Sequence, residues 1–187
     1  MLSMIELEHK VKSCKRCRLC QARTNTVFGE GVTNANLMFI GEAPGGDEDR
    51  LGRPFVGKAG QLLDKALNAL AFDRQQNFYI TNICKCRPES NRTPMEDEAE
   101  ACLPYLRNQV ALIKPKIIVC LGATAAKFII DRDSRISKIR GQWIERKGYY
   151  LIATFHPAAL LRDESKKRLM WEDLKKVKVK FDEISNV

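Results

Sequence analysis

The sequence has no long hydrophobic stretch. No apolar run approaches the roughly 20 residues that a membrane-spanning helix needs. The first ten residues, MLSMIELEHK, include two acidic side chains and lack the apolar core of a signal peptide. These absences exclude a transmembrane helix and a secretory leader, and they predict a cytoplasmic protein with no membrane partner.

Histidine is also scarce, and internal repeats, low-complexity tracts and linkers are absent. The 187 residues contain two histidines, His9 and His156, and His9 falls in an N-terminal helical pattern typical of a surface position. A chain of this length is long enough for one full core and too short to favour two. We therefore expect a single domain spanning residues 1–187.

Charge is plentiful and unevenly placed. The chain has 32 Lys and Arg residues against 23 Asp and Glu residues, a formal net charge of +9. The basic residues gather before residue 24 and again after residue 161. Such a surface is typical of a protein that binds a polyanion, although a basic run can also be a solvated helix face.

Seven cysteines are present, and their spacing indicates a metal site. In a reducing compartment cysteines rarely form structural disulfides, so metal ligation is the better expectation. Cys14, Cys17 and Cys20 begin like a bacterial ferredoxin run, but Thr24 stands where its fourth cysteine would be. The remaining ligands must come from elsewhere in the chain, where the other cysteines are Cys84, Cys86, Cys102 and Cys120.

Hydrophobic patterning predicts an α/β domain. Four apolar segments, at residues 37–40, 78–82, 116–121 and 149–154, alternate with helical patterns, and near-continuous apolar runs are typical of parallel strands that are buried on both faces. We expect a three-layer α/β/α domain with a central four-stranded parallel sheet.

The helical patterns lie between and after these strands. Helices are expected at residues 60–70, at 123–130, and over a long segment that opens with a capping box at residues 93–96. The tail from residue 166 fits a helix loosely, whereas residues 177–181 also alternate like a strand; length favours the helix.

Two polar runs follow predicted strands directly. Residues 41–45 (GEAPG) follow the first strand, and residues 156–162 (HPAALLR) follow the fourth. Because ligands bind beyond the carboxyl ends of the strands in an open parallel sheet, these runs should line one pocket. Asn82 ends the second strand at the same edge, although an Asn there is also typical of a simple turn.

Position by position, these runs resemble the paired active-site motifs of the uracil-DNA glycosylase superfamily, and most closely its iron–sulfur branch, family 4. The resemblance extends from Cys14 to about Met170. It implies a monofunctional enzyme that flips uracil out of DNA and hydrolyses the N-glycosidic bond, leaving an abasic site for base excision repair. Its partner would be uracil-containing DNA, and the protein is expected to be a monomer without a clear sliding-clamp motif.

The resemblance also implies roles for individual residues. Asn82 would read the uracil edge, and His156 would stabilise the departing base. Ala43 has no polar side chain to position the attacking water, so Glu42 is the nearest candidate for that role. Leu160 would enter the duplex, with Leu161 as its rival, and Arg162 would hold a phosphate. The residues implied to contact the base are Gly41, Ala43, Glu48, Phe55 and Asn82. Residues 47–49 could instead form a solvated acidic loop.

Family spacing assigns four of the cysteines to a cofactor. Cys14, Cys17, Cys86 and Cys102 reproduce the family pattern, which implies a 4Fe–4S cluster that ties the N-terminal segment to the domain. Spacing by itself leaves tetrahedral zinc open, since four thiolates suit either group. Two further alternatives are a non-catalytic iron–sulfur DNA-binding module and a glycosylase that acts on another damaged base.

Overall fold

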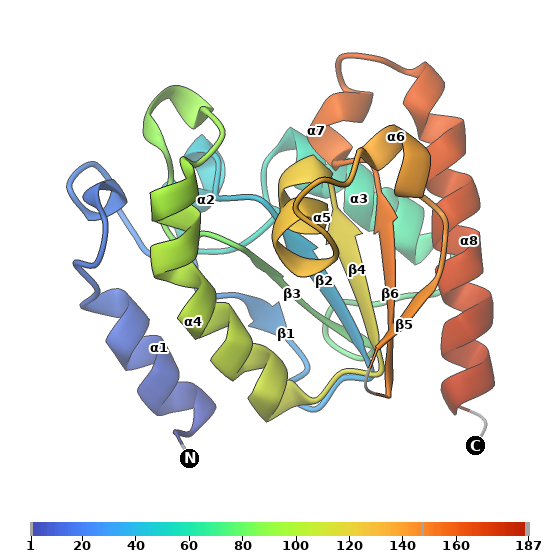
Figure 1. The fold of residues 1–187 in the computed structure, drawn as a ribbon, viewed down its shortest axis with the longest axis horizontal. Coiled ribbons are helices and arrows are strands. Elements are labelled where there is room, and N and C mark those ends of the chain that lie inside the picture. Colours follow the sequence, from blue (N-terminus) through green and yellow to red (C-terminus); the bar gives the residue numbers. More distant parts are fainter. Residues whose placement is uncertain (1, 147, 186–187) are drawn as a thin grey trace.

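A computed structural model describes residues 2–146 and 148–185, which form an α/β fold around one sheet (Figure 1). The strands are β1 (Glu30–Gly31), β2 (Leu37–Gly41), β3 (Phe78–Asn82), β4 (Ile117–Leu121), β5 (Ile144–Arg146) and β6 (Tyr149–Thr154). The helices are α1 (Met4–Lys12), α2 (Gly46–Leu51), α3 (Lys58–Asn68), α4 (Glu96–Ile113), α5 (Ala123–Ile129), α6 (Ile136–Ile139), α7 (Pro157–Leu160) and α8 (Ser165–Ser185). Short 3-10 turns lie at Arg18–Cys20 and Glu89–Asn91.

The sheet has the order β1-β3-β2-β4-β6-β5. Its four central strands are parallel, and they are the four strands that the sequence predicts. Two short antiparallel strands, β1 and β5, extend the sheet at its edges. The expected α/β class is confirmed, and the expected sheet of four strands is corrected to a mixed sheet of six.

Alternation along the strands builds the three layers. Leu37 and Phe39 pack with residues of α3 and α8, whereas Met38 and Ile40 pack with residues of α4 and α5 on the opposite face. Successive side chains of a strand point to opposite faces, so a fully apolar strand is buried on both. Helix α1 packs outside α4, away from the sheet (Figure 1).

One local expectation needs correction, and one alternative that the sequence left open is decided. The long helix starts later than the predicted capping box at residues 93–96, because Met95 is its N-cap and the Met95 N–H donates to Glu98 Oε2 at 2.8 Å. Residues 47–49 do not form a solvated acidic loop; they belong to α2, and Asp49 is buried. The tail forms a helix from Ser165 to Ser185, which confirms the helix expected there rather than the alternative strand.

No helix in the described parts of the chain could cross a membrane.

Candidate functional site

A pocket opens beyond the carboxyl ends of β2, β3 and β6. Its volume of about 330 Å³ is at the small end of the usual range for small-molecule sites. Among the residues singled out from the sequence, those that line it are Glu42, Ala43, Glu48, Phe55, Asn82, His156 and Arg162. The two strand-end runs therefore meet, as the parallel topology predicts.

One wall of the pocket was not predicted. Pro88, Asn91, Arg92 and Thr93 line it as well. They lie in the segment between β3 and α4, six to eleven residues after Asn82, so their place after a strand end was the signal that could have identified them.

Asn82 has a buried and unpaired amide oxygen. The residue is 2% exposed, and Asn82 Oδ1 has no hydrogen-bond partner among the described residues. A Cβ atom added to Gly41 would lie 2.5 Å from Asn82 Oδ1 and 2.5 Å from Phe55 Cζ. Gly41 is therefore close to the pocket residues without lining the pocket, and its lack of a side chain lets them approach. A buried acceptor without a partner is costly, so this atom suits a ligand donor.

His156 is held in one tautomer. It is the N-cap of α7, and its Nδ1 accepts from Ala158 N at 3.2 Å. An acceptor nitrogen cannot carry the proton, so the neutral ring carries it on Nε2. Burial, and secondarily the charge of Arg162, lower the pKa of His156 to about 4. The ring is therefore a neutral Nε2–H donor at pH 7.

Glu42 is oriented by a residue that sequence reasoning missed. The Thr124 hydroxyl, in the first turn of α5, donates a hydrogen bond to Glu42 Oε2. Thr124 follows β4, the remaining parallel strand, whose carboxyl end faces the same edge of the sheet as those of β2, β3 and β6. Helix α5 thus positions the carboxylate that stands beside Ala43 in the pocket.

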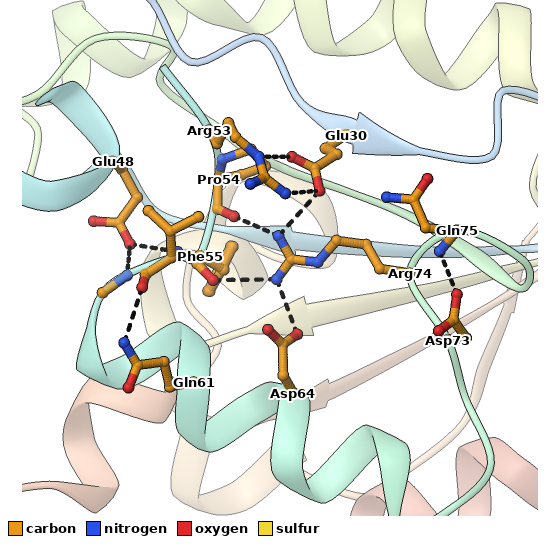
Figure 2. A network of polar contacts seen from close by, with 12 residues as sticks. Glu30, Glu48, Arg53, Pro54, Phe55, Gln61, Asp64, Asp73, Arg74 and Gln75 are labelled. Atoms are coloured by element: carbon orange, nitrogen blue, oxygen red, sulfur yellow. Dashed lines mark hydrogen bonds and ion pairs between the residues drawn. The ribbon is translucent and has the colours of Figure 1, made fainter. Parts of the chain in front are cut away.

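Glu48, on α2, is bonded to the backbone of the loop that carries Phe55 (Figure 2). Its Oε1 accepts from Val56 N at 2.9 Å and from Gly57 N at 2.8 Å. Its Oε2 accepts from Gly45 N at 3.1 Å. Both carboxylate oxygens accept from backbone N–H groups, so Glu48 holds the loop at Val56 and Gly57 against α2. The sequence did not reveal this structural role.

The two leucines of the HPAALLR run have exchanged environments relative to expectation. Leu160 is 3% exposed and packs in the core with residues of α3 and α8. Leu161 is 51% exposed. An apolar side chain that enters a DNA duplex must be free to leave the protein surface, and the exposure of Leu161 suits that role better than the burial of Leu160. Arg162 is exposed at the pocket rim.

A second, smaller pocket is lined by cysteines. The side chains come from the N-terminal segment, the loop after β3 and α4, and they are Cys14, Cys17, Cys20, Cys86 and Cys102. All four expected ligands are therefore brought together, with Cys20 as a fifth. In the described part of the chain, no group of three or more His, Cys, Asp or Glu side chains already has the geometry of a metal site.

Three basic residues, Arg16, Arg23 and Lys85, line the same pocket as these cysteines. Arg23 Nη1 donates to Cys86 Sγ at 3.1 Å, and Lys85 N donates to Cys102 Sγ at 3.3 Å. The Lys85 side chain is buried, and its ammonium donates to the neutral acceptors Thr81 Oγ1 at 2.6 Å and Asn82 O at 2.7 Å. A buried cation needs a nearby anion, and thiolate ligands would supply one. The donor set and its surroundings therefore fit a thiolate-bound metal group.

Comparison with known proteins agrees with this arrangement. The profile of the uracil DNA glycosylase superfamily matches residues 28–175. The chain is 44% identical to a type-4 uracil-DNA glycosylase of Sulfurisphaera tokodaii, over 95% of this chain and 84% of that protein. It is also 44% identical to the type-4 enzyme of Thermotoga maritima, over 92% of this chain and 91% of that protein. A type-5 uracil-DNA glycosylase of Pyrobaculum aerophilum is 30% identical over 70% of this chain.

Proposed function

The chain belongs to the type-4 branch of the uracil-DNA glycosylase superfamily, and we propose that the pocket beyond β2, β3 and β6 is where it binds and releases uracil. The protein is a DNA repair hydrolase that acts on uracil in DNA. The observation that best supports the site is that Asn82, whose buried amide oxygen has no partner among the described residues, lines the same pocket as His156, whose neutral ring carries its proton on Nε2.

Asn82 would identify the base by its edge. Uracil presents an N3–H donor and an O4 acceptor, so the amide oxygen can accept from N3–H while the amide nitrogen donates to O4. Cytosine has no proton on N3 and an amine at C4, which mismatches both groups. The pocket would therefore favour uracil because the wrong base leaves buried polar groups unpaired.

His156 and Glu42 would act on the glycosidic bond. When the bond between uracil N1 and the sugar breaks, the base leaves as an anion and the sugar becomes oxocarbenium-like. The neutral His156 Nε2–H can donate to uracil O2 as charge develops there. Glu42, held by Thr124, would orient the attacking water that Ala43 cannot.

Phe55 would stack against the flipped base. Its ring borders the pocket, 5.8 Å from the His156 ring between centroids. Base stacking on an aromatic side chain is worth about 1–3 kcal/mol. Arg162 at the rim would hold a backbone phosphate, as exposed arginines do in most DNA complexes.

Replacing Asn82 tests the base-reading proposal. Asn82→Ala should slow single-turnover excision from a uracil-containing oligonucleotide by roughly 5- to 150-fold, because N3–H and O4 are then buried without partners. Asn82→Asp should also be impaired, since it removes the donor to O4. The exposed Asn68→Ala is the matched control and should match the wild type.

Substrates with cytosine and with a T·G mismatch, assayed beside uracil, measure selectivity. Unchanged uracil excision by Asn82→Ala would rule out the assignment. Efficient release of another damaged base, with poor release of uracil, would instead identify a glycosylase of different specificity.

The exchange of Leu160 and Leu161 gives a second prediction. Leu161→Ala should slow excision from duplex DNA by about tenfold and spare single-stranded DNA, because the wedge fills the space that a flipped base leaves in a stack. Leu160→Ala should lower the stability of the fold by about 2–5 kcal/mol, the usual cost of emptying a core leucine site. Rates on both substrates and thermal melts separate these effects. Equal losses on single and double strands for Leu161→Ala would contradict the wedge.

The cysteine pocket is proposed to hold a 4Fe–4S cluster. Cys14, Cys17, Cys86 and Cys102 would ligate it, with Cys20 nearby. When bound, the cluster would supply a structural cross-link between the N-terminal segment, the loop after β3 and α4. We propose in addition that the chain acts as a single-domain monomer.

A further inference from the structure

The loop that carries Phe55 has an unusual backbone. Phe55 has φ = 54°, in the left-handed region that side chains other than glycine rarely adopt. Such conformations persist only where the surroundings hold them, and they cluster at functional sites. Gly60 packs closely against the same residue, because a Cβ atom added there would lie 1.9 Å from Phe55 O. Helix α3 therefore presses directly against the loop.

Arg74 holds the carbonyl side of this loop, from outside the uracil pocket (Figure 2). Arg74 Nη1 donates to Pro54 O at 2.7 Å, and Arg74 Nη2 donates to Phe55 O at 3.1 Å. The side chain is 12% exposed. A planar guanidinium with several fixed donors can bridge two successive carbonyls, which a lysine ammonium cannot do with the same geometry.

Glu48 holds the same loop from the amide side. The peptide bond between Phe55 and Val56 is fixed at both ends, because its carbonyl accepts from Arg74 and its N–H donates to Glu48. Two charged side chains of opposite sign therefore set the direction in which the Phe55 Cα–Cβ bond points.

Arg74 is itself anchored by acidic residues of two other elements. Arg74 Nη2 donates to Asp64 Oδ1 of α3 at 2.9 Å, and Arg74 Nη1 lies 3.6 Å from Glu30 Oε1 of β1. Glu30 also accepts two hydrogen bonds from Arg53, at 2.7 and 2.8 Å. The position of Arg74 is therefore fixed relative to both α3 and the edge of the sheet.

We propose that Arg74 is a positioning residue for uracil recognition, acting through the backbone of Phe55. The inference rests on the proposed function of Phe55 as the stacking surface. Arg74 does not line the uracil pocket, so its contribution reaches the base through the orientation of that ring. Loss of Arg74 frees the Phe55 peptide to leave its left-handed conformation, and the ring then no longer presents a fixed face.

A double-mutant cycle with Phe55 tests this coupling, with inhibition by free uracil and single-turnover excision as readouts. Phe55→Ala should weaken inhibition by free uracil by roughly 5- to 150-fold, the loss of one stacking surface. Arg74→Met should weaken inhibition by free uracil by roughly 5- to 20-fold, which cannot exceed the effect of removing the Phe55 ring itself. In the Phe55→Ala background, Arg74→Met should add less than about twofold, because coupled residues are not additive.

Arg53→Met is the matched control. Arg53 shares Glu30 with Arg74 but makes no hydrogen bond to a carbonyl of the loop in the described structure, so free uracil should inhibit this variant as it does the wild type. Thermal melts accompany every variant. If Arg74→Met does not fold, Arg74→Lys replaces it, since it keeps a cation beside Asp64 and loses the bridge between the two carbonyls.

The outcomes separate the two proposals. If Phe55→Ala leaves uracil inhibition unchanged, the stacking function of Phe55 fails. If Phe55→Ala weakens inhibition while the Arg74 variants do not, or if the two effects multiply, the positioning role of Arg74 is overturned. A lowered melting temperature with unchanged uracil inhibition would likewise reduce Arg74 to a structural residue.

Discussion

Replacing His156 with alanine is expected to slow the chemical step of uracil excision by about 100- to 1000-fold, the usual cost of one donor to a developing anion. Duplex binding should change little, because phosphate contacts provide most of the affinity. Single-turnover rates and a separate binding titration measure the two quantities. His9→Ala is the matched control, since His9 is exposed on α1. A wild-type rate for His156→Ala would disprove the assignment.

The pH dependence gives the same prediction a second readout. Because burial, assisted by Arg162, lowers the pKa of His156 to about 4, the ring stays neutral as the pH falls from 7 toward 5. Protonation of His156 should therefore cause no loss of rate in that range. Below it, a proton on Nδ1 would face the Ala158 N–H donor and disrupt the N-cap.

The stability of the fold should fall as the pH drops, whereas a salt-bridged histidine loses its stabilising effect as the pH rises. The unfolded chain has the ordinary histidine pKa of about 6.5, so it binds more protons than the folded chain between pH 6.5 and about 4. Stability then falls as the pH drops through that window. Thermal melts of wild type and His156→Ala across this range should converge at low pH.

Replacing Cys102 with serine is expected to abolish metal binding and to impair folding severely. Cys102 is buried on α4 and shares a pocket with cysteines of the N-terminal segment. Removing a ligand of a structural metal group removes its binding free energy from folding. Metal analysis after anaerobic purification should find about four irons per wild-type chain, a brown colour, and neither in Cys102→Ser.

Two other cysteines serve as controls for the ligand set. Cys20→Ser should keep its iron although Cys20 lies in the same pocket, and Cys120→Ala should keep it because Cys120 lies within β4. If Cys20→Ser loses its iron while Cys14→Ser retains it, Cys20 rather than Cys14 is the cluster ligand. Stoichiometric zinc without iron would replace the proposed cluster with a zinc site.

Much of the fold could be predicted because strands that are buried in a parallel sheet have a recognisable run of apolar residues in the sequence. Three of the central strands, β2, β3 and β4, are buried along their whole length, and β6 is buried from Leu151 to Thr154, so their sequences are largely apolar. Strands β1 and β5 have two and three residues, too short for any periodicity to emerge. Helix α4 starts two residues later than the predicted capping box implies, because the capping contact comes from Glu98 and not from Thr93.

The position of the pocket could also be predicted, because polar residues that end parallel strands reach the same edge of a sheet. Residues 41–45, Asn82 and His156 were all identified in this way, and the structure brings residues 42–45, Asn82 and His156 to one pocket. Their chemical roles were inferred from resemblance.

The four central strands, the main helices and the edge of the sheet that carries the site could be predicted from the sequence alone, because these depend on the periodicity of neighbouring residues. Tertiary structure decided that Leu161 rather than Leu160 faces solvent, that Thr124 orients Glu42, and that Arg74 and Glu48 hold the Phe55 loop. Each of these is a contact between segments separated along the chain, or a burial that depends on a helix packed from elsewhere. Local patterns hold no record of such contacts, since one polar residue at one position can face solvent or bond to a distant backbone group with equal ease.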